Sequence, residues 1–458
     1  MSSPAWFSLG CKVATHMGRS LVIVSVLTAV AAAQPGTWRF DFGAGDVAPG
    51  HIGVTADAVF SVERGYGFEP GAPLRTVDRG GPDPLRGDFV TADSAFYFTA
   101  AVPEGNYRVT VTLGDLAGES DTTVKAELRR LMLEGVRTRP GGFETRTFIV
   151  NVRRPQIAAV DGIAAGEMRL KAPRETTQEA WAWDGCLTLE FNGSRPAVGA
   201  VEIMPVDVPT VFLLGDSTVC DQSREPFTSW GQMLTRFFQP TVAIANHGES
   251  GETYRDSLGR RRLDKILSVM KPGDTLLMQF GHNDQKQIAT GRGGPFTTYK
   301  DEIRQHVEGV RARGGQPVLV SPMERRAFAA DGTVVRSLAD YAEATRQAAA
   351  ELGVPFIDLH AMSLPLYAAL ERQGRDVSQR AFAPNDNTHH NNYGAYQIAQ
   401  CVAQGLKDAG LPLAQHLAAD FAGYDPARPD PLDTFAVPPS PMVTHLRPLG
   451  DEPVAGKP

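Results

Sequence analysis

The sequence is poor in cysteine, which excludes a disulfide-rich scaffold. Only four cysteines occur among 458 residues, and no two of them have the Cys-x-x-Cys spacing of metal and redox sites. We expect Cys186, Cys220 and Cys401 to be small core residues with at most one disulfide. The sequence also lacks a His-Glu-x-x-His pair and a phosphate-binding glycine loop, so no motif predicts a metal site or an organic cofactor.

An excess of positive charge is missing as well. The formal net charge is −7 at pH 7, whereas binding to nucleic acid requires a basic face that neutralises phosphates. We therefore expect no nucleic-acid partner. The length favours two folded domains, because a domain typically has about 100 to 200 residues.

Long apolar runs are absent except near the N-terminus. Lys12 and Arg19 precede an apolar run over residues 21–33 that ends in three alanines, a pattern typical of an export signal. The run is shorter than the ~20 residues that span a bilayer, although an uncleaved anchor stays an alternative. Removal of residues 1–33 deletes two basic residues and no acidic ones, which changes the net charge to −9. We predict a secreted or periplasmic protein with no membrane partner after signal cleavage.

Residues 34–208 show the pattern of an all-β sandwich. Short apolar runs cover residues 37–42, 89–100, 107–113, 147–152, 187–191 and 198–203, and turn-rich stretches separate them. Between Tyr107 and Leu113 every second residue is apolar, which places these side chains on one face of a sheet. Many short strands without a convincing helix are typical of two packed sheets.

The pattern changes at residue 209 and predicts an α/β/α domain with a parallel sheet up to residue 412. Short apolar runs at residues 211–214, 241–245, 275–280, 317–320 and 355–357 alternate with segments of helical periodicity. Strands that alternate with helices indicate a parallel sheet covered on both faces. Nine prolines fall in residues 426–458, so we interpret residues 413–458 as a Pro-rich tail that either wraps around the protein or is disordered.

Four polar segments follow the predicted strands or precede the last helix of the second domain. They are Gly215-Asp216-Ser217-Thr218, residues 246–253, Gly281-His282-Asn283-Asp284 and Asp386-Asn387-Thr388-His389. Each segment alone is more often a turn or a helix cap. Ligands bind at the carboxyl ends of parallel strands, so we expect the four segments to converge at one edge of the sheet.

These segments contain residue types that suit nucleophilic catalysis. A carboxylate three residues before a histidine can accept a hydrogen bond from its Nδ1, which leaves Nε2 free to take a proton from a serine. Ser217, Asp386 and His389 follow one of the known chain orders of such triads. Glycine allows close approach of the backbone, and an asparagine amide is a neutral donor for a developing oxyanion.

Taken together, the four segments resemble the motifs of the SGNH (GDSL-like) hydrolase superfamily, and within it those of the rhamnogalacturonan acetylesterases. The resemblance covers residues 209–412. Residues 38–43, 63–69 and 198–205 are similar to the galactose-binding-like sandwich that precedes some bacterial pectin acetylesterases, in which it holds a sugar or supports the catalytic domain.

The resemblance implies a role for each residue. Ser217 would be the nucleophile, His389 the general base and Asp386 the residue that orients the histidine. The oxyanion hole would comprise the Ser217 N–H, the Gly251 N–H and the Asn283 side-chain amide. Gly251 is preferred to Gly248 because it aligns with the glycine of the family's Gly-Arg-Ser form, in which Glu252-Thr253 here replaces Arg-Ser. No cofactor is implied.

The implied activity is that of a secreted serine esterase that removes O-acetyl groups from pectic polysaccharide, with rhamnogalacturonan as the first candidate. The partner would be an acetylated polysaccharide or oligosaccharide. Arg255, Arg325 and Arg326 are candidates for holding a galacturonate carboxylate. A solvated helix face explains these arginines, and the neighbouring Arg260, Arg261 and Arg262, equally well. Acetylated xylan, another glycan, a small ester, or sugar binding without catalysis remain alternatives.

The residues next to these motifs are expected to have structural rather than catalytic roles. We expect Asp216, His282 and His390 to be supporting residues rather than bases or metal ligands. Trp181 and Trp183 alternate as they would on one face of a strand, where core packing is favoured over sugar stacking.

Overall fold

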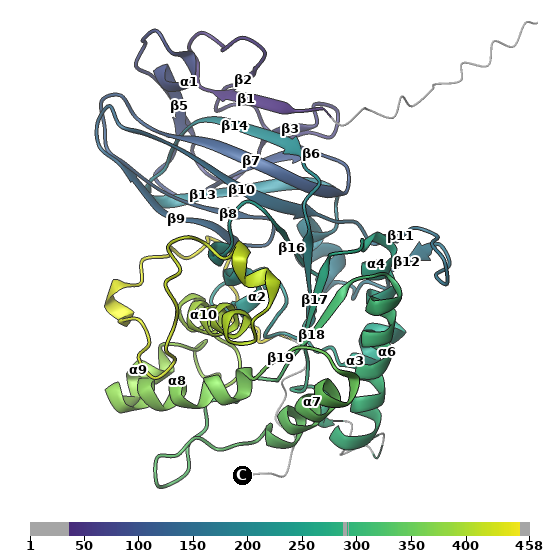
Figure 1. The fold of residues 1–458 in the computed structure, drawn as a ribbon. Coiled ribbons are helices and arrows are strands. Elements are labelled where there is room, and N and C mark those ends of the chain that lie inside the picture. Colours follow the sequence, from purple (N-terminus) through teal and green to yellow (C-terminus); the bar gives the residue numbers. More distant parts are fainter. Residues whose placement is uncertain (1–35, 287–290, 292, 449–458) are drawn as a thin grey trace, which may run out of the picture. The chain divides into compact units, whose positions relative to one another are not determined.

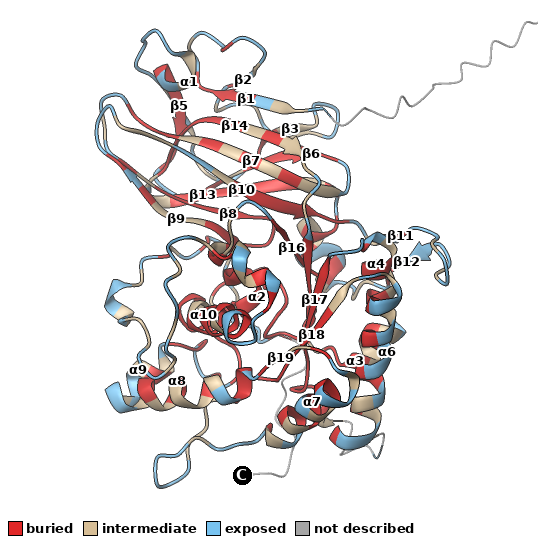
Figure 2. Ribbon diagram, in the orientation of Figure 1, coloured by how far each residue is buried: buried red, intermediate tan, exposed pale blue. Residues whose placement is uncertain are grey.

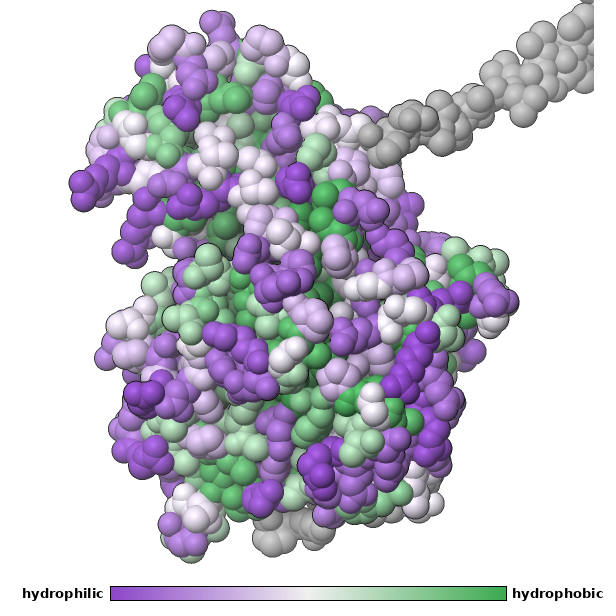
Figure 3. Space-filling view, viewed as in Figure 1, coloured by the Kyte–Doolittle hydropathy of each residue, from purple (hydrophilic) through white to green (hydrophobic). Residues whose placement is uncertain are grey.

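The computed structural model describes residues 36–286, 291 and 293–448. The predicted export signal, residues 1–33, lies outside the described residues. From Gly36 onward the chain forms one compact unit. Among the described residues, no helix has both the length and the apolar character needed to cross a bilayer. Hydrophilic residues cover most of the face shown in Figure 3, and hydrophobic residues gather there only in small separate areas.

The first part of the chain folds into two packed β-sheets (Figure 1). One sheet has the order β10-β7-β14-β1-β2, with β5 paired to β14 and β4 to β5, and the other has the order β3-β6-β13-β8-β9. The strands are β1 (Trp38–Phe42), β2 (Ile52–Val54), β3 (Tyr66–Phe68), β4 (Arg75–Asp78), β5 (Asp88–Thr91), β6 (Phe96–Ala101), β7 (Gly105–Gly114), β8 (Ser120–Ala126), β9 (Arg130–Thr138), β10 (Phe143–Val152), β13 (Cys186–Arg195) and β14 (Ala197–Pro205). A separate ribbon pairs β11 (Gln156–Ile157) with β12 (Gly166–Glu167).

The alternation seen in the sequence produces the core between these sheets. Tyr107, Val109, Val111 and Leu113 are all buried, and the residues between them are half-buried. Their side chains share a core with aromatic residues such as Phe98 of the opposite sheet. The apolar run over residues 89–100 forms two strands rather than one. Strand β5 belongs to the first sheet and β6 to the second.

Sequence patterning did not predict β8 and β9, because both contain or border charged residues that are buried. Lys125 on β8 pairs with Glu190 at 3.3 Å. Arg129 and Arg130, at the start of β9, reach across to residues that follow Ser217 and pair with Glu225 at 2.6 Å and Asp221 at 2.9 Å. These ion pairs place the sandwich directly against the second part of the chain.

The second part contains a five-stranded sheet of order β16-β15-β17-β18-β19, in which all four neighbouring pairs are parallel. The last sandwich strand ends at Pro205 and this sheet begins at Thr210, on either side of the boundary predicted at residue 208. Its strands are β15 (Thr210–Gly215), β16 (Ala243–Asn246), β17 (Thr275–Gln279), β18 (Gln316–Val320) and β19 (Phe356–Ile357).

Helices lie on both sides of this sheet (Figure 1). The described helices are α1 (Pro84–Gly87), α2 (Trp230–Leu234), α3 (Tyr254–Gly259), α4 (Arg262–Val269), α6 (Lys300–Ala312), α7 (Ala339–Leu352), α8 (Leu359–Gln373), α9 (Arg375–Gln379) and α10 (Asn392–Asp408). Shorter helical turns are η1 (Arg174–Gln178), η2 (Ala180–Ala182), η3 (Thr235–Phe237), η4 (Pro295–Tyr299), η5 (Pro412–His416) and η6 (Leu432–Thr434).

Strand β15, between β16 and β17, is buried along its whole length. Figure 2 shows that these two neighbouring strands are largely buried as well. Val211 and Leu213 share one core with Ile398 of α10, whereas Phe212 and Leu214 share another with Ile303 of α6. An unbroken apolar run is therefore required here, because both faces of the strand are covered.

The proline-rich C-terminal segment packs against the rest of the protein up to residue 448. Leu413, Leu417 and Val437 are buried in the core that contains α10. Ser440 accepts a hydrogen bond from Lys125 Nζ at 2.7 Å and donates to Glu190 of the sandwich. Of the two predicted alternatives, the wrapping one describes residues 413–448, because neighbouring elements supply the core that this segment cannot form alone.

Two expectations about single residues need comment. Cys186, Cys220 and Cys401 are free thiols, and the last two are buried. The prediction that Trp181 and Trp183 lie on a strand is wrong, since residues 180–182 form η2. Trp183 is nevertheless buried and packs against Arg153, with the guanidinium 4.6 Å from the ring centroid.

Candidate active site

Ser217 lies in the turn that follows strand β15. A Cβ at Gly215 would come within 2.4 Å of the Gln279 carbonyl oxygen, so only glycine lets the chain leave the sheet here. The Ser217 Oγ is 2.9 Å from His389 Nε2, and the residue is 3% exposed. A hydroxyl at the carboxyl end of the sheet therefore meets an imidazole from a segment 172 residues further along the chain.

Asp386 and His389 form a compact loop immediately before α10. The Asp386 Oδ2 is 2.9 Å from His389 Nδ1, and its Oδ1 accepts backbone hydrogen bonds from Thr388 and His389 at 2.8 and 3.0 Å. Although burial opposes ionisation, the hydrogen bonds from His389 and from these backbone groups hold the pKa of Asp386 well below its usual value. The ionised carboxylate favours the tautomer with the proton on Nδ1, which leaves Nε2 as the acceptor facing Ser217.

The segment after β16 presents a backbone N–H beside the turn that contains Ser217. Gly251 has a φ of +75°, a conformation that strongly favours glycine. Within the described part of the chain, its N–H and that of Ser217 donate no hydrogen bond. The Gly248 N–H, in contrast, already donates to Asn246 Oδ1 at 3.1 Å. These contacts favour Gly251 over Gly248 as the available donor.

Asn283 lies in the turn after β17. Its Nδ2 donates one hydrogen bond to the Glu252 carbonyl at 3.1 Å, which leaves the second amide hydrogen for another acceptor. Asp284 holds the turn by accepting the Gly281 N–H at 3.0 Å. The side chain of Asn283 is thus tied to the same segment that carries Gly251.

The residues expected to play supporting roles are bonded within the protein. Asp216 accepts from Thr218 N and Oγ1 and lies 3.2 Å from His282 Nδ1. His390 is bonded through Nε2 to the Tyr367 hydroxyl at 3.0 Å, and burial lowers its pKa to about 3. Neither histidine belongs to a group of three or more candidate metal ligands, and no such group exists among the residues that the structure describes.

The three candidate arginines have protein partners. Arg255 donates to Glu302 at 2.7 Å, and Arg325 donates to Gln285 and to the His282 carbonyl. Arg326 donates to the Asn387 side chain at 2.7 Å. Of these, Arg325 and Arg326 contact segments that contain Asn283 or Asp386, whereas Glu302, a partner of Arg255, lies on α6.

The solvated-face interpretation of the neighbouring arginines is wrong for Arg262. That side chain is fully buried and pairs with Glu252 at 3.0 Å and with Glu175 at 2.5 Å. Because Glu252 and Thr253 replace the family's Arg-Ser, the acidic side chain here occupies a buried position that requires cations around it.

Sequence reasoning missed a cluster of charges that the sandwich part contributes to this site. Lys171 donates to the Ser250 carbonyl at 2.5 Å and pairs with Glu252 at 3.3 Å. Arg174 pairs with Glu249 at 2.9 Å and donates to Gln222, whose amide donates to the Ser217 carbonyl at 2.7 Å. No local signal marks residues 171–174, since their partners lie roughly 50 to 80 residues away.

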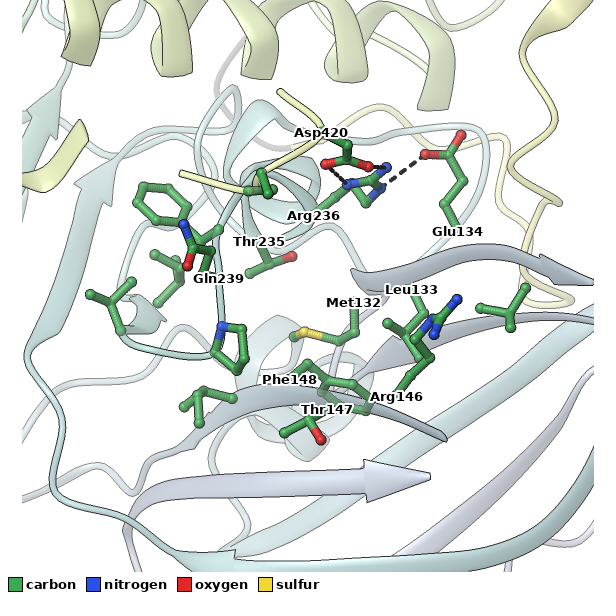
Figure 4. Close-up of a pocket in the computed structure, with 18 of the residues that line it drawn as sticks. Met132, Leu133, Glu134, Arg146, Thr147, Phe148, Thr235, Arg236, Gln239 and Asp420 are labelled. Carbon is green, nitrogen blue, oxygen red and sulfur yellow. Dashed lines mark hydrogen bonds and ion pairs between the residues drawn. The ribbon is translucent and has the colours of Figure 1, made fainter. Parts of the chain in front are cut away.

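A cavity of about 440 Å³ lies away from the triad and is drawn in Figure 4. Its walls come from β9, β10, η3 and residues 418–420, and none of the predicted site residues lines it. Arg236 pairs with Asp420 at 2.8 Å and with Glu134 at 3.1 Å, as the dashed lines in Figure 4 mark. The charge of this guanidinium is already compensated by two carboxylates.

A serine, a histidine and an aspartate in one hydrogen-bonded chain are the arrangement that serine hydrolases use. Residues 213–396 match the model of the GDSL-like lipase/acylhydrolase family. Residues 38–153 match a second model, described as beta-agarase/YXIM esterase-like, galactose-binding domain-like.

Two curated relatives and one solved structure are similar to this chain. The chain is 37% identical to the rhamnogalacturonan acetylesterase RhgT of Bacillus subtilis (strain 168) over 224 residues, which are 46% of this chain and 94% of RhgT. It is 27% identical to the uncharacterized esterase YxiM of the same organism over 392 residues, which are 83% of this chain and 94% of YxiM. The crystal structure of YxiM aligns at 25% identity with a TM-score of 0.43, covering 82% of this chain and 99% of that one.

The chain belongs to the GDSL-like lipase/acylhydrolase family, with a galactose-binding-like domain ahead of the SGNH hydrolase domain. It is an enzyme, a carbohydrate esterase. The resemblance inferred from the four sequence motifs is thereby confirmed.

Proposed function

We propose that this protein is a secreted serine acetylesterase that removes O-acetyl groups from pectic polysaccharide, with rhamnogalacturonan as its first substrate. The observation that carries the catalytic part is the chain of contacts from Ser217 Oγ to His389 Nε2 and from His389 Nδ1 to Asp386, each 2.9 Å long. The substrate part is supported by the names of its relatives, which include rhamnogalacturonan acetylesterases from Bacillus subtilis and Emericella nidulans.

In the proposed reaction, Ser217 is the nucleophile and His389 the general base. As the Ser217 oxygen bonds to the acetyl carbonyl carbon, its proton passes to His389 Nε2 and the carbonyl oxygen becomes an oxyanion. Asp386 stays ionised, orients the imidazole and stabilises the imidazolium. The tetrahedral intermediate then collapses, and the sugar hydroxyl leaves with the proton that His389 returns.

A second half-reaction releases acetate. Water gives a proton to His389 Nε2 while its oxygen attacks the acetyl group on Ser217, and collapse of this intermediate restores the serine hydroxyl. In both halves the oxyanion would accept hydrogen bonds from the Ser217 N–H, the Gly251 N–H and the Asn283 amide. The loss of one such donor typically raises the barrier by about 2.7 to 4 kcal/mol.

The buried charge cluster supports a role for the galactose-binding-like domain in shaping the site. Lys171 and Arg174 both contact the segment that carries Gly251. We propose that this domain holds the catalytic segment in place, whether or not it also binds sugar. The predicted export signal supports action outside the cytoplasm, which fits a polymeric substrate.

The test is acetate release by the purified protein and by its Ser217→Ala variant. Each would be incubated with acetylated rhamnogalacturonan, acetylated xylan and 4-nitrophenyl acetate. We expect the wild type to release acetate from rhamnogalacturonan and the Ser217→Ala variant to release none. Equal release by both proteins would remove Ser217 from the mechanism, and release from xylan alone would contradict the pectic substrate. Sugar binding without any release would favour a non-catalytic binding protein.

A further inference from the structure

A second cavity, of about 420 Å³, lies between three segments that are distant in sequence. Its walls are formed by residues 172–178 after the sandwich ribbon, residues 222–227 after the Ser217 turn, and residues 444–448 of the C-terminal segment. The volume falls within the range of pockets that hold small ligands. Two of the three walls lie outside residues 213–396, which match the hydrolase family.

This cavity adjoins the triad through side chains that line it. The Phe227 ring meets the His389 ring edge-on, with centroids 5.8 Å apart. Gln222 donates to the Ser217 carbonyl at 2.7 Å. Arg447 Nε lies 3.7 Å from Asp386 Oδ2. A group bound in the cavity would therefore lie next to the ester that Ser217 attacks.

Three guanidinium groups line the cavity, and they differ in how far protein carboxylates neutralise them. Arg174 pairs with Glu179 and Glu249 at 2.6 and 2.9 Å, so its charge is compensated. Arg224 is exposed and makes no hydrogen bond or ion pair with any residue that the structure describes. Arg447 is 46% exposed, donates to the Asn385 carbonyl, and has Asp386 as its nearest carboxylate.

Apolar groups complete the lining. Pro173, Phe227 and Leu446 present hydrocarbon surface beside the guanidinium groups. Such a combination suits a sugar that carries a carboxylate, since the C–H face of a pyranose packs on apolar groups and a guanidinium binds a carboxylate with two parallel hydrogen bonds.

We propose that this cavity is a subsite for a uronate residue of the substrate, with Arg224 as its principal carboxylate ligand and Arg447 as a second. This inference rests on the proposed function and extends it, because it assigns the acidic character of the substrate to named residues. The sandwich segment and the C-terminal segment then take part in substrate selection. Arg224 replaces the sequence-based candidates Arg255, Arg325 and Arg326 in this role.

Binding to a catalytically silent protein tests the subsite without depending on turnover. The Ser217→Ala protein would be titrated by calorimetry with trigalacturonate and, separately, with a neutral galactose trisaccharide. We expect trigalacturonate to bind more tightly, with an affinity that falls as salt is added. Adding Arg224→Gln should weaken trigalacturonate binding roughly tenfold, since one charged hydrogen-bonding pair is lost.

Two further variants complete this design. Arg224→Lys keeps the charge but loses the paired donors, so it should restore part of the affinity. Arg346→Gln removes an arginine on α7 that pairs with Glu343, and it should bind trigalacturonate as the Ser217→Ala parent does. Arg224 is exposed, so we expect its variants to keep the thermal midpoint of the parent.

Each outcome bears on the subsite separately from the proposed function. Unchanged trigalacturonate affinity in Arg224→Gln, or equal affinity for the acidic and neutral sugars, overturns the subsite even if the wild type deacetylates rhamnogalacturonan. Arg224-dependent binding of trigalacturonate supports it even if the wild type releases no acetate from a pectic polymer, in which case the proposed reaction alone fails.

Discussion

Lys171 of the sandwich segment donates a hydrogen bond to the backbone carbonyl of Ser250, at 2.5 Å. Ser250 directly precedes Gly251, whose N–H is the proposed oxyanion donor. The same ammonium pairs with Glu252 on the other side of that glycine. One cation from the segment between β12 and η1 therefore contacts both neighbours of this proposed oxyanion donor.

This contact predicts that Lys171→Met lowers kcat more than it raises KM. The substitution leaves the Ser250 carbonyl without its donor, so the Gly251 N–H is less well aligned with the transition state. We expect a loss in kcat of roughly tenfold, partly restored in Lys171→Arg, measured with 4-nitrophenyl acetate. Lys407→Met is a matched control, because that lysine also donates to a backbone carbonyl, of Ala422, at 3.2 Å. A change in KM alone would contradict the positioning role.

Asp386→Asn is expected to reduce kcat by about four orders of magnitude with little effect on folding. The amide keeps the size of the carboxylate but donates to Nδ1, which favours the wrong tautomer of His389. Because the hydrogen bonds at Asp386 hold its pKa well below the usual value, loss of activity on mild acidification is not expected to follow protonation of this carboxyl. The rates of both proteins would be measured across the pH range. A variant with activity comparable to that of the wild type would contradict the role assigned to Asp386.

Asn283→Ala should lower kcat by about 10² to 10³, which corresponds to the loss of one oxyanion donor. The Asn283 amide also donates to the Glu252 carbonyl. An Asn283→Asp variant keeps the shape of the side chain but loses both amide hydrogens, so its kcat should fall by a similar factor. Steady-state kinetics with an aryl acetate would measure both. An Asn283→Ala enzyme with near-normal kcat would remove this side chain from the oxyanion hole.

Stability should depend on pH through Glu127. Burial raises the pKa of this carboxyl to about 8 from an ordinary value of 4.5, against the opposing effect of Arg130. Between these two pH values the folded protein holds a proton that the unfolded chain has released, so the free energy of unfolding falls as pH rises through this range. Glu127→Gln keeps an acceptor for the Thr188 N–H, a bond of 3.1 Å, and should flatten this decline.

Urea unfolding at about pH 5 and about pH 8 would measure the effect in the wild type and in Glu127→Gln. Glu63→Gln, at an exposed position, serves as the control and should follow the wild type. An equal decline in Glu127→Gln and the wild type would show that other groups cause it.

Local patterning was sufficient for most of the framework. Alternation at Tyr107 to Leu113 and the apolar runs of the parallel sheet depend only on which faces of a strand are buried, and that information lies within a few neighbouring residues. The candidate triad residues could also be predicted, since Asp386 and His389 are close in sequence and Ser217 follows a buried strand. Strands β8 and β9 could not be predicted, because Lys125, Arg129 and Arg130 are charged residues of the kind usually found on the surface.

The sequence by itself determined the two kinds of sheet, the motifs and the family, because each depends on residues close together in the chain. Only the tertiary structure decided which charges are buried and what surrounds the site. Arg130 meets Asp221 across 91 residues, and Arg262 meets Glu175 across 87. A charge is tolerated in a core only when a partner arrives there, and that partner is supplied by the fold rather than by the neighbouring sequence. For the same reason, a cavity lined by Arg224 and Arg447 exists only once three distant segments have come together.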